Sequence, residues 1–284
     1  NTVRDAAVRL AVCGDGHERA ERIALAEQAI LKGSPAPLVQ ALRNRGVFFG
    51  EGKPGKLAFL FPGQGSQYLG MLKDLIDADC AIIRETFEEA DRVMTPLLGH
   101  PLTDVVFGDN KDALKQTEIT QPAMLAADVA LMRYMNSLGF FPDGTMGHSL
   151  GEYAALVCGG ALRFEDALTA VSARGREMAN IDVPDMGKMA SAFASGDDIE
   201  KVLEPIRAAG GYVVCANRNS HVQTVIAGSS AGVDQACDAM GKLGIKIVRL
   251  EVSAAFHTKI VAPAQEPLMR VLKGMNIQTP PIPV

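Results

Sequence analysis

The chain has 284 residues, of which 48% are hydrophobic, and carries 28 lysines and arginines against 33 aspartates and glutamates. This length allows a substantial core in one or two domains, and the net charge of -5 gives no basic field that would favour nucleic acid or an anionic membrane as a partner. No apolar run reaches the roughly 18 to 20 residues of a membrane span, and the N-terminus lacks the pattern of a signal peptide, so we expect a cytoplasmic protein.

The first 56 residues look separate from the rest. "VRLAVCG" at 8–14 has strand character, "HERAERIALAEQAIL" at 17–31 is an amphipathic helix, and "GVFFGEGKPGK" at 46–56 is a strand that runs into a Gly/Pro-rich linker. We expect a small α/β linker region here.

Two later segments have the pattern of buried parallel strands that end in tight turns. "LAFLFPGQGSQYLGM" begins at Leu57, and "TMGHSLGEYAALVCGGAL" begins at Thr145 and continues into a helix of small residues over about 150–157. Ser149 lies in a G-x-S-x-G string, which is typical of a nucleophile elbow between a strand and a helix. We expect one of Gly147 and Gly151 to adopt unusual backbone angles and the other to allow close helix-to-strand approach.

Residues 182–252 show a different pattern of short strands and two helices. The strands are predicted at 187–195, 212–218, 221–228 and 246–252, with helices that start near Asp197 and Ser230. The order β-α-β-β-α-β is the ferredoxin-like arrangement, which predicts a subdomain inserted between 57–181 and 253–284. The tail after His257 holds one helix and a proline-rich end.

The cysteines are odd in number and form no C-x-x-C pair: Cys13, Cys80, Cys158, Cys215 and Cys237. This pattern argues against a disulfide framework and against a structural zinc site. We expect buried free thiols and no bound metal.

Ser149 needs a base, and the chain offers five histidines. His17, His100 and His221 fall in surface segments. His148 adjoins the serine, but neighbouring side chains in a sharp turn point apart, so it is expected to pack against or orient the elbow. His257 follows a strand, where α/β proteins place functional groups. The pattern leaves it open whether His257 is a base or a core histidine.

Arg174 lies on the inward face of a predicted helix. The apolar residues around it follow 3, 4 and 7 spacing: Phe164, Ala167, Leu168, Val171, Gly175 and Met178. A guanidinium that faces inward keeps its charge and therefore needs an anion beside it. Its planar, forked set of N–H donors is suited to binding a carboxylate at two points. The spacing leaves open whether that anion is an internal carboxylate or a substrate.

The loop "PGQGSQ" at 62–67 matches neither a phosphate-binding nor a dinucleotide-binding motif. Its exposed amides are suited to an oxyanion instead. An elbow's oxyanion hole combines the amide after the nucleophile, here that of Leu150, with one from another loop. We expect Gln64 or its neighbour to supply the second.

Four motifs in order resemble the malonyl-CoA:acyl carrier protein transacylase family: "FPGQGSQ" at 61–67, "GHSLGE" at 147–152, "ARG" at 173–175 and "AAFH" at 254–257. The resemblance covers roughly 57–284 and is closer to acyltransferase domains of multidomain polyketide or polyunsaturated fatty acid synthases. It implies an α/β-hydrolase-like core (57–181 and 253–284) with an inserted ferredoxin-like subdomain, preceded by a ketosynthase-to-acyltransferase linker (1–56). It also implies an adjoining ketosynthase domain and an acyl carrier protein domain as partners.

The same resemblance implies the roles of the site residues. Ser149 would be the acylated nucleophile, His257 its base, Arg174 the ligand of the malonyl carboxylate, and the amides of Gln64 and Leu150 the oxyanion hole. Malonyl-CoA would be a substrate, phosphopantetheine would be carried by the acceptor, and no cofactor would be bound. Further substrate-binding positions are implied at His148, Asn217 and Phe256.

The resemblance also bears on substrate choice and on the chain end. Phenylalanine before the histidine accompanies malonyl use in the family, whereas methylmalonyl enzymes tend to carry serine there and glutamine at the position of Leu150. Family members continue beyond "PPIPV" into a segment that helps orient the histidine. The resemblance therefore implies a fragment.

Two rival functions remain. An esterase or thioesterase of the α/β-hydrolase type would need an acid between serine and histidine to hold the imidazole, and four residues qualify by order: Asp182, Asp185, Asp234 and Glu251. A non-catalytic docking domain would explain the N-terminal linker region but not the combination of Ser149, His257 and Arg174.

Overall fold

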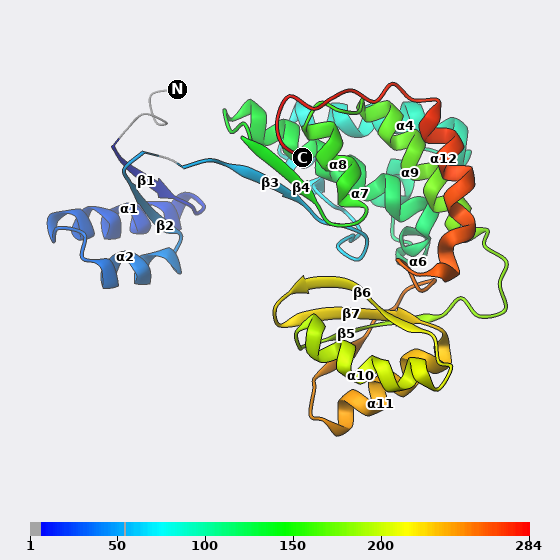
Figure 1. Cartoon of the computed structure of the whole chain (residues 1–284). Helices are drawn as coiled ribbons and strands as arrows, with labels where there is room; N and C mark the ends of the chain where they lie inside the picture. Colours follow the sequence, from blue (N-terminus) through cyan, green and yellow to red (C-terminus); the bar gives the residue numbers. More distant parts are fainter. Residues whose placement is uncertain (1–6, 54) are drawn as a thin grey trace. The chain divides into compact units, whose positions relative to one another are not determined.

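The computed structural model describes residues 7–53 and 55–284 and divides into two compact units, Asn1–Leu57 and Ala58–Val284 (Figure 1). Residues 1–6 and Pro54, which belong to the predicted linker region, lie outside the described residues.

The first unit is a two-stranded sheet with two helices. The strands β1 (Val8–Val12) and β2 (Val47–Glu51) pair antiparallel, and the chain between them forms α1 (Gly16–Leu31) and α2 (Ala36–Arg43). Both strands and α1 confirm the prediction. The helix α2 was not predicted; its first turn contains a proline, a residue that the start of a helix tolerates. A small apolar cluster fills the unit: Ala26, Ala29, Leu42 and Val47.

The core of the second unit is mostly helical. Its parallel strands β3 (Ala58–Phe61) and β4 (Gly144–Gly147) are separated in sequence by a long helical stretch. The helices between the two strands are α3 (Lys73–Asp77), α4 (Ala81–Leu98), α5 (Leu102–Val106), α6 (Lys111–Lys115) and α7 (Thr117–Ser137). After β4 come α8 (Gly151–Cys158) and α9 (Phe164–Ala179), both close to their predicted positions.

The central helix of this core is α7. Its first half is buried apart from Glu118, although it includes the polar residues Thr117, Thr120 and Gln121. It packs against α9 at close range: a Cβ at Gly175 would lie 2.7 Å from the Glu118 Cα. The chain closes this unit with a 3-10 turn (Lys259–Ala264), α12 (Gln265–Lys273) and a proline-rich end, where Pro283 O accepts a hydrogen bond from Thr145 N of β4 at 2.9 Å.

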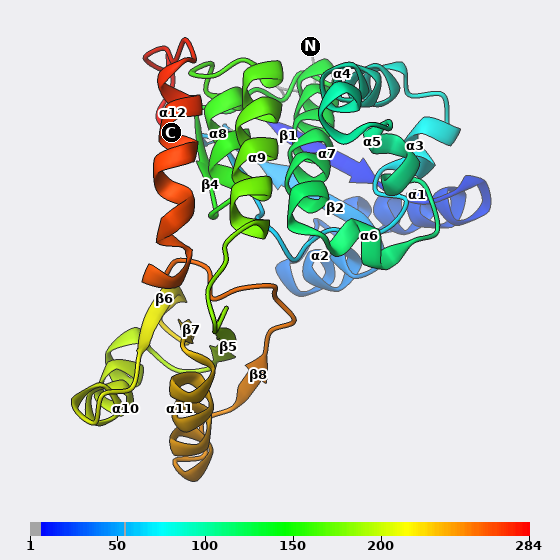
Figure 2. The ribbon, with the colours of Figure 1, turned by 90° about the vertical axis from the view of Figure 1, so that its right-hand side faces the viewer.

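Between α9 and the 3-10 turn lies an antiparallel four-stranded sheet covered by two helices. The elements follow the predicted order: β5 (Lys188–Ala192), α10 (Gly196–Ala208), β6 (Val213–Ser220), β7 (Gln223–Gly228), α11 (Ser230–Lys242) and β8 (Ile247–Arg249). The strands are arranged β6-β7-β5-β8. Figures 1 and 2 show α10 and α11 on the sheet face that points away from the helical core, so the other face turns toward it.

The cysteines are all free thiols, but the expectation that all are buried is wrong. Only Cys237 is buried, Cys13 is exposed, and the other three are half-buried. Cys13 follows β1 directly and takes no part in the small apolar cluster of the first unit.

Among the described residues, no helix is both long and apolar enough to cross a bilayer.

Candidate active site

Ser149 lies in the sharp turn between β4 and α8. Its φ is 54°, a left-handed conformation that is costly for a residue with a side chain. The turn is held by His148 N, which donates to Phe61 O of β3 at 3.0 Å, and by Gly151 N, which donates to His148 O at 3.0 Å. This is the strained strand-to-helix turn that the elbow motif predicts.

The two glycines of the motif serve one purpose rather than two. A Cβ at Gly147 would overlap the backbone of Gly151, and a Cβ at Gly151 would overlap the Phe61 carbonyl. Neither glycine has a positive φ. The expectation that one of them carries the unusual backbone angles is therefore wrong, because the strain falls on Ser149 itself and both glycines permit close backbone approach.

His257 contacts the serine directly. The Ser149 Oγ and the His257 Nε2 are 2.8 Å apart, within the range for proton transfer between a nucleophile and its base. The preceding residues Ala254 and Ala255 are buried, and Ala255 N donates to Met186 O at 2.8 Å. The backbone of His257 has a positive φ of 59°, and this anchoring presents its imidazole to the elbow.

The pKa of His257 lies below its usual range. Burial is the main cause, and the positive charge of Arg174 and the neighbouring His148 lower it further, while Glu152 opposes them. A lowered pKa keeps the imidazole neutral at neutral pH. It is then in the form that accepts a proton.

No carboxylate forms a hydrogen bond with this imidazole in the described part of the chain. Asp185 instead accepts bonds from Ser230 and Gly187, Asp234 pairs with Lys188 and Arg249, and Glu251 is exposed and faces Lys115. Asp182 forms no hydrogen bond or ion pair with the ring either in the described residues. The geometry thus gives no support to the acid that an esterase triad requires.

Arg174 projects from α9 into the same space as Ser149 and His257. Its Nη1 donates to Oε1 of Gln121, a fully buried residue of α7, at 2.8 Å. Burial lowers the pKa of Arg174, with Tyr153 and Glu152 opposing. Among the described residues no carboxylate lies within ion-pair distance of it, so the internal ion pair that the sequence left open is not found there.

The Gly-rich loop packs against the elbow. A Cβ at Gly63 would lie 2.6 Å from His148 O and 3.6 Å from Leu150 N. Within the described residues, the amides of Gln64 and Leu150 have no protein hydrogen-bond acceptor. Unpaired backbone donors at the edge of a cavity are suited to a ligand oxygen.

All eight predicted site residues line one cavity. Its volume is about 710 Å³, within the usual range of small-molecule sites. The eight come from distant parts of the sequence: Gln64, His148, Ser149, Leu150, Arg174, Asn217, Phe256 and His257. None of the other three histidines lines it, and in the described residues no group of histidine, cysteine and acidic side chains could hold a metal ion.

The sheet supplies the opposite wall of the cavity through residues of all four strands, and β6 contributes two asparagines. The pairing of β6 with β7 shifts register between Cys215 and Asn217 and again between Arg218 and Ser220. Such bulges re-aim side chains, often beside active sites. Asn217 and Asn219 thus line the cavity, while Arg218, between them, points to α10.

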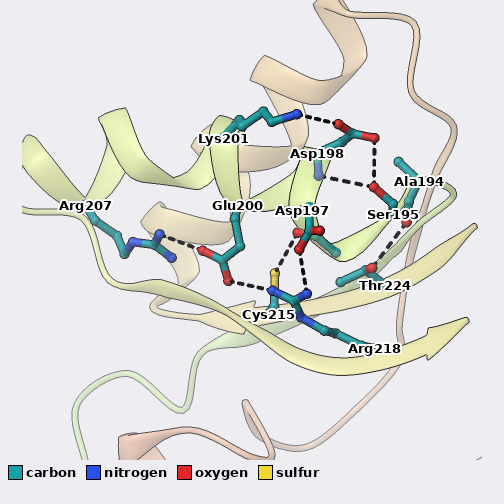
Figure 3. Close-up of polar contacts among 11 residues, drawn as sticks. Ala194, Ser195, Asp197, Asp198, Glu200, Lys201, Arg207, Cys215, Arg218 and Thr224 are labelled. Atoms are coloured by element: carbon teal, nitrogen blue, oxygen red, sulfur yellow. Dashed lines mark hydrogen bonds and ion pairs between the residues drawn. The ribbon is translucent and has the colours of Figure 1, made fainter. Parts of the chain in front are cut away.

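Figure 3 shows how the bulged strand is attached to α10. Arg218 Nη1 lies 2.8 Å from Asp197 Oδ1, and its Nη2 lies 3.9 Å from Glu200 Oε1. Glu200 also accepts a bond of 2.7 Å from Arg207 Nη2. These contacts hold the strand on its helix side, so that the two asparagines face the cavity.

Two residues that the sequence reasoning missed belong to this site. Asn219 Oδ1 lies 2.9 Å from the His148 Nε2, and Gln121 holds Arg174. Gln121 carried a signal, because it is a polar residue in a run of apolar ones, "TQPAMLAADVALM". Asn219 carried none, because a bulge cannot be recognised from the residue pattern.

Comparison with known families places most of the chain in one of them. Residues 58–284 match the family model described as "Acyl transferase domain". The malonyl CoA-acyl carrier protein transacylase of Bacillus subtilis is 40% identical over 233 residues, which cover 81% of this chain and 71% of that protein. A phenolphthiocerol synthesis polyketide synthase of Mycobacterium marinum is 34% identical over 93% of this chain, which spans only 12% of that protein.

Solved structures agree with this placement. The malonyl CoA-acyl carrier protein transacylase of Coxiella burnetii is 41% identical, with a TM-score of 0.75 over 81% of this chain and 72% of its own. The acyltransferase domain from the second module of the salinomycin polyketide synthase is 32% identical, with a TM-score of 0.80 over 99% of this chain and 62% of its own.

Proposed function

The chain belongs to the acyl transferase domain family, and from this membership and the site geometry we propose that it moves a malonyl group from coenzyme A to the phosphopantetheine thiol of an acyl carrier protein. The relatives named above as malonyl CoA-acyl carrier protein transacylases support this reaction. A further relative of known structure is a malonyl-transacylase in complex with its acyl carrier protein.

The first half of the reaction forms a serine ester. His257 Nε2 takes the proton of Ser149 Oγ while the oxygen attacks the thioester carbonyl. The resulting oxyanion lies against the amides of Gln64 and Leu150. The C–S bond then breaks, and the imidazolium returns its proton to the departing coenzyme A thiolate.

The second half repeats these steps with a different thiol. The carrier thiol gives its proton to His257 and attacks the ester carbonyl, the C–O bond to Ser149 breaks, and the imidazolium reprotonates Oγ. One base and one oxyanion hole thus serve both halves. No bound cofactor enters this scheme.

The malonyl assignment depends on the positive charge of Arg174 and on the groups around it. Arg174 is a half-buried cation without a protein carboxylate within ion-pair distance in the described residues, in the same cavity as the Ser149–His257 pair. A buried charge needs an opposite charge, and the malonyl carboxylate supplies one that the guanidinium can bind at two points.

The domain organisation follows the same proposal. We assign 57–181 and 253–284 to an α/β-hydrolase-like core and 182–252 to an inserted ferredoxin-like subdomain, which the antiparallel order β6-β7-β5-β8 supports. We assign 1–56 to a linker from an adjoining ketosynthase, supported by the polyketide synthase that matches 93% of the chain. Five free thiols are in keeping with the reducing cytoplasm.

Intact-mass measurement after mixing with malonyl-CoA tests the proposal. We expect a malonyl adduct on the wild-type chain that persists until a carrier thiol is added. The adduct should be lost in Ser149→Ala and kept in Ser137→Ala, a change at an exposed serine of α7. Rapid release of free malonate would identify a hydrolase, and no adduct on any variant would favour a docking domain.

A further inference from the structure

The cavity carries more positive charge than its proposed chemistry uses. Its charged lining residues are Lys111, Lys115, Arg174 and Glu251, in a chain whose net charge is -5. Arg174 is assigned to the malonyl carboxylate. The two lysines are left without a role.

Both lysines come from one face of α6. They are four residues apart, a spacing that places side chains on the same side of a helix. Leu114, between them in sequence, is buried and also lines the cavity. The lysines themselves are exposed, so α6 lies at the rim of the cavity rather than in its interior.

This rim lies where the helical core meets the segment that leaves β8. Thr117 Oγ1 at the start of α7 is 3.0 Å from Ser253 Oγ, and Lys115 Nζ is 3.7 Å from Glu251 Oε2. Residues of that segment line the cavity with α6. A molecule that enters between the two therefore passes the lysines.

The two ammonium groups are available to a ligand. Among the described residues Lys111 has no ion-pair partner, and Lys115 has only long contacts, at 3.5 Å to Asp112 and 3.7 Å to Glu251. Neither contact is a hydrogen bond. Exposed pairs of this kind stabilise a protein by about 0 to 1 kcal/mol, so an incoming anion with several acceptor oxygens can replace them.

We propose that Lys111 and Lys115 bind the phosphate end of the pantetheine arm whose thiol or thioester reaches Ser149. This assignment rests on the proposed function. The arm is common to the donor, where it continues into the diphosphate of coenzyme A, and to the acceptor, where a phosphodiester joins it to the carrier protein. Both substrates thus present phosphate at the far end of the same arm.

Donors with and without phosphate test this proposal directly. We compare malonyl-CoA with malonyl-pantetheine, which has the same thioester and no phosphate, by the rate at which Ser149 gains a malonyl mass. For Lys111→Gln/Lys115→Gln at low salt we expect kcat/KM to fall about 5- to 20-fold with malonyl-CoA and to stay unchanged with malonyl-pantetheine. Added salt should narrow the difference, since it screens exposed charges.

The matched control is Lys32→Gln/Lys242→Gln, which removes the same charge from exposed positions outside the cavity and should leave both rates unchanged. Glu251→Gln should act in the opposite direction, raising kcat/KM with malonyl-CoA, because it removes an anion beside Lys115. Equal losses with both donors, or no loss with either, would overturn the proposal.

The rate of malonyl transfer from Ser149 to the carrier protein, measured with the same lysine variants, identifies which phosphate the lysines bind. A loss with malonyl-CoA alone assigns the lysines to the diphosphate of coenzyme A, and a parallel loss with the phosphopantetheinylated carrier protein assigns them to both arms. If wild-type Ser149 gains no malonyl group from either donor, the proposed function fails. If it does and the variants show no phosphate dependence, only the lysine assignment fails.

Discussion

His148 Nε2 and Asn219 Oδ1 lie 2.9 Å apart and join the residue before the nucleophile to the bulged strand β6. The His148 backbone is at the same time bonded to β3 and to the start of α8. The elbow and the sheet that forms the opposite wall of the cavity therefore hold each other in position.

Replacing Asn219 with alanine should slow acylation of Ser149. The change removes one hydrogen bond, of a kind that contributes about 1 kcal/mol, so we expect a loss of about 5-fold in the rate of malonyl adduct formation. Asn276→Ala, at an exposed position outside the cavity, is the control. If Asn219 acts through His148, the effects of Asn219→Ala and His148→Ala will be non-additive; additive losses would contradict this.

Arg174→Ala should invert donor preference. Loss of a hydrogen-bonded charge costs about 1.5 to 3 kcal/mol, so malonyl transfer should fall about 10- to 150-fold, while acetyl transfer should be kept because a neutral acyl group needs no cation. Competition between malonyl-CoA and acetyl-CoA, read by mass, measures the ratio. The control is Arg176→Ala, on the exposed side of the same helix. Equal losses for both donors would make Arg174 structural.

The pH dependence of acylation should follow His257. Its pKa is lowered by burial and then by Arg174, and the neutral imidazole is the active base, so activity should persist to a pH below the ordinary histidine pKa of about 6.5. In Arg174→Ala one lowering charge is gone, and the acidic limb of kcat/KM for acetyl-CoA should move to higher pH. If the acidic side of this pH profile stays at the same pH or moves to lower pH, Arg174 does not lower the pKa of this imidazole.

Phe256 should favour malonyl over methylmalonyl donors. It lines the cavity beside His257 and packs on a cluster that includes Met189 and Val225. Because this packing holds the phenyl ring in place, the ring cannot move aside for the methyl branch of a methylmalonyl group. Overpacking costs about 1 to 3 kcal/mol, or about 5- to 150-fold in discrimination. Phe256→Ser should narrow the gap in a competition at equal concentrations. Equal labelling of Ser149 by both donors in the wild type would contradict the assignment.

Asp128 should make the protein less stable as the pH rises. Burial within α7 raises the pKa of this carboxyl from 3.8 to about 7, so the folded state binds its proton more tightly than the unfolded state does. The associated stability is complete below about pH 4 and is lost as the pH passes about 7, with a shift of about three units corresponding to about 4 kcal/mol. Asp128→Asn should raise the unfolding free energy at pH 8 but not at pH 4. Equal effects at both pH values would contradict the assignment.

The sequence alone determined the local structure around Ser149 and in residues 182–252. The strand before Ser149, the helix after it and the β-α-β-β-α-β order all follow from hydrophobic periodicity and glycine placement, which act over a few neighbouring residues. The inward face of Arg174 follows from helical spacing for the same reason. Even here, only backbone packing could assign the strained angle to Ser149 rather than to Gly147 or Gly151.

The tertiary structure decided what these elements do together. Ser149 and His257 are 108 residues apart in sequence, and no local pattern sets the distance between their side chains. The same holds for the absence of a carboxylate within ion-pair distance of Arg174 among residues 7–53 and 55–284, for the role of Gln121 and for the bulges that turn Asn219 to His148. Each depends on how distant elements pack, because a side chain's partners in a folded core come from segments that sequence spacing does not relate.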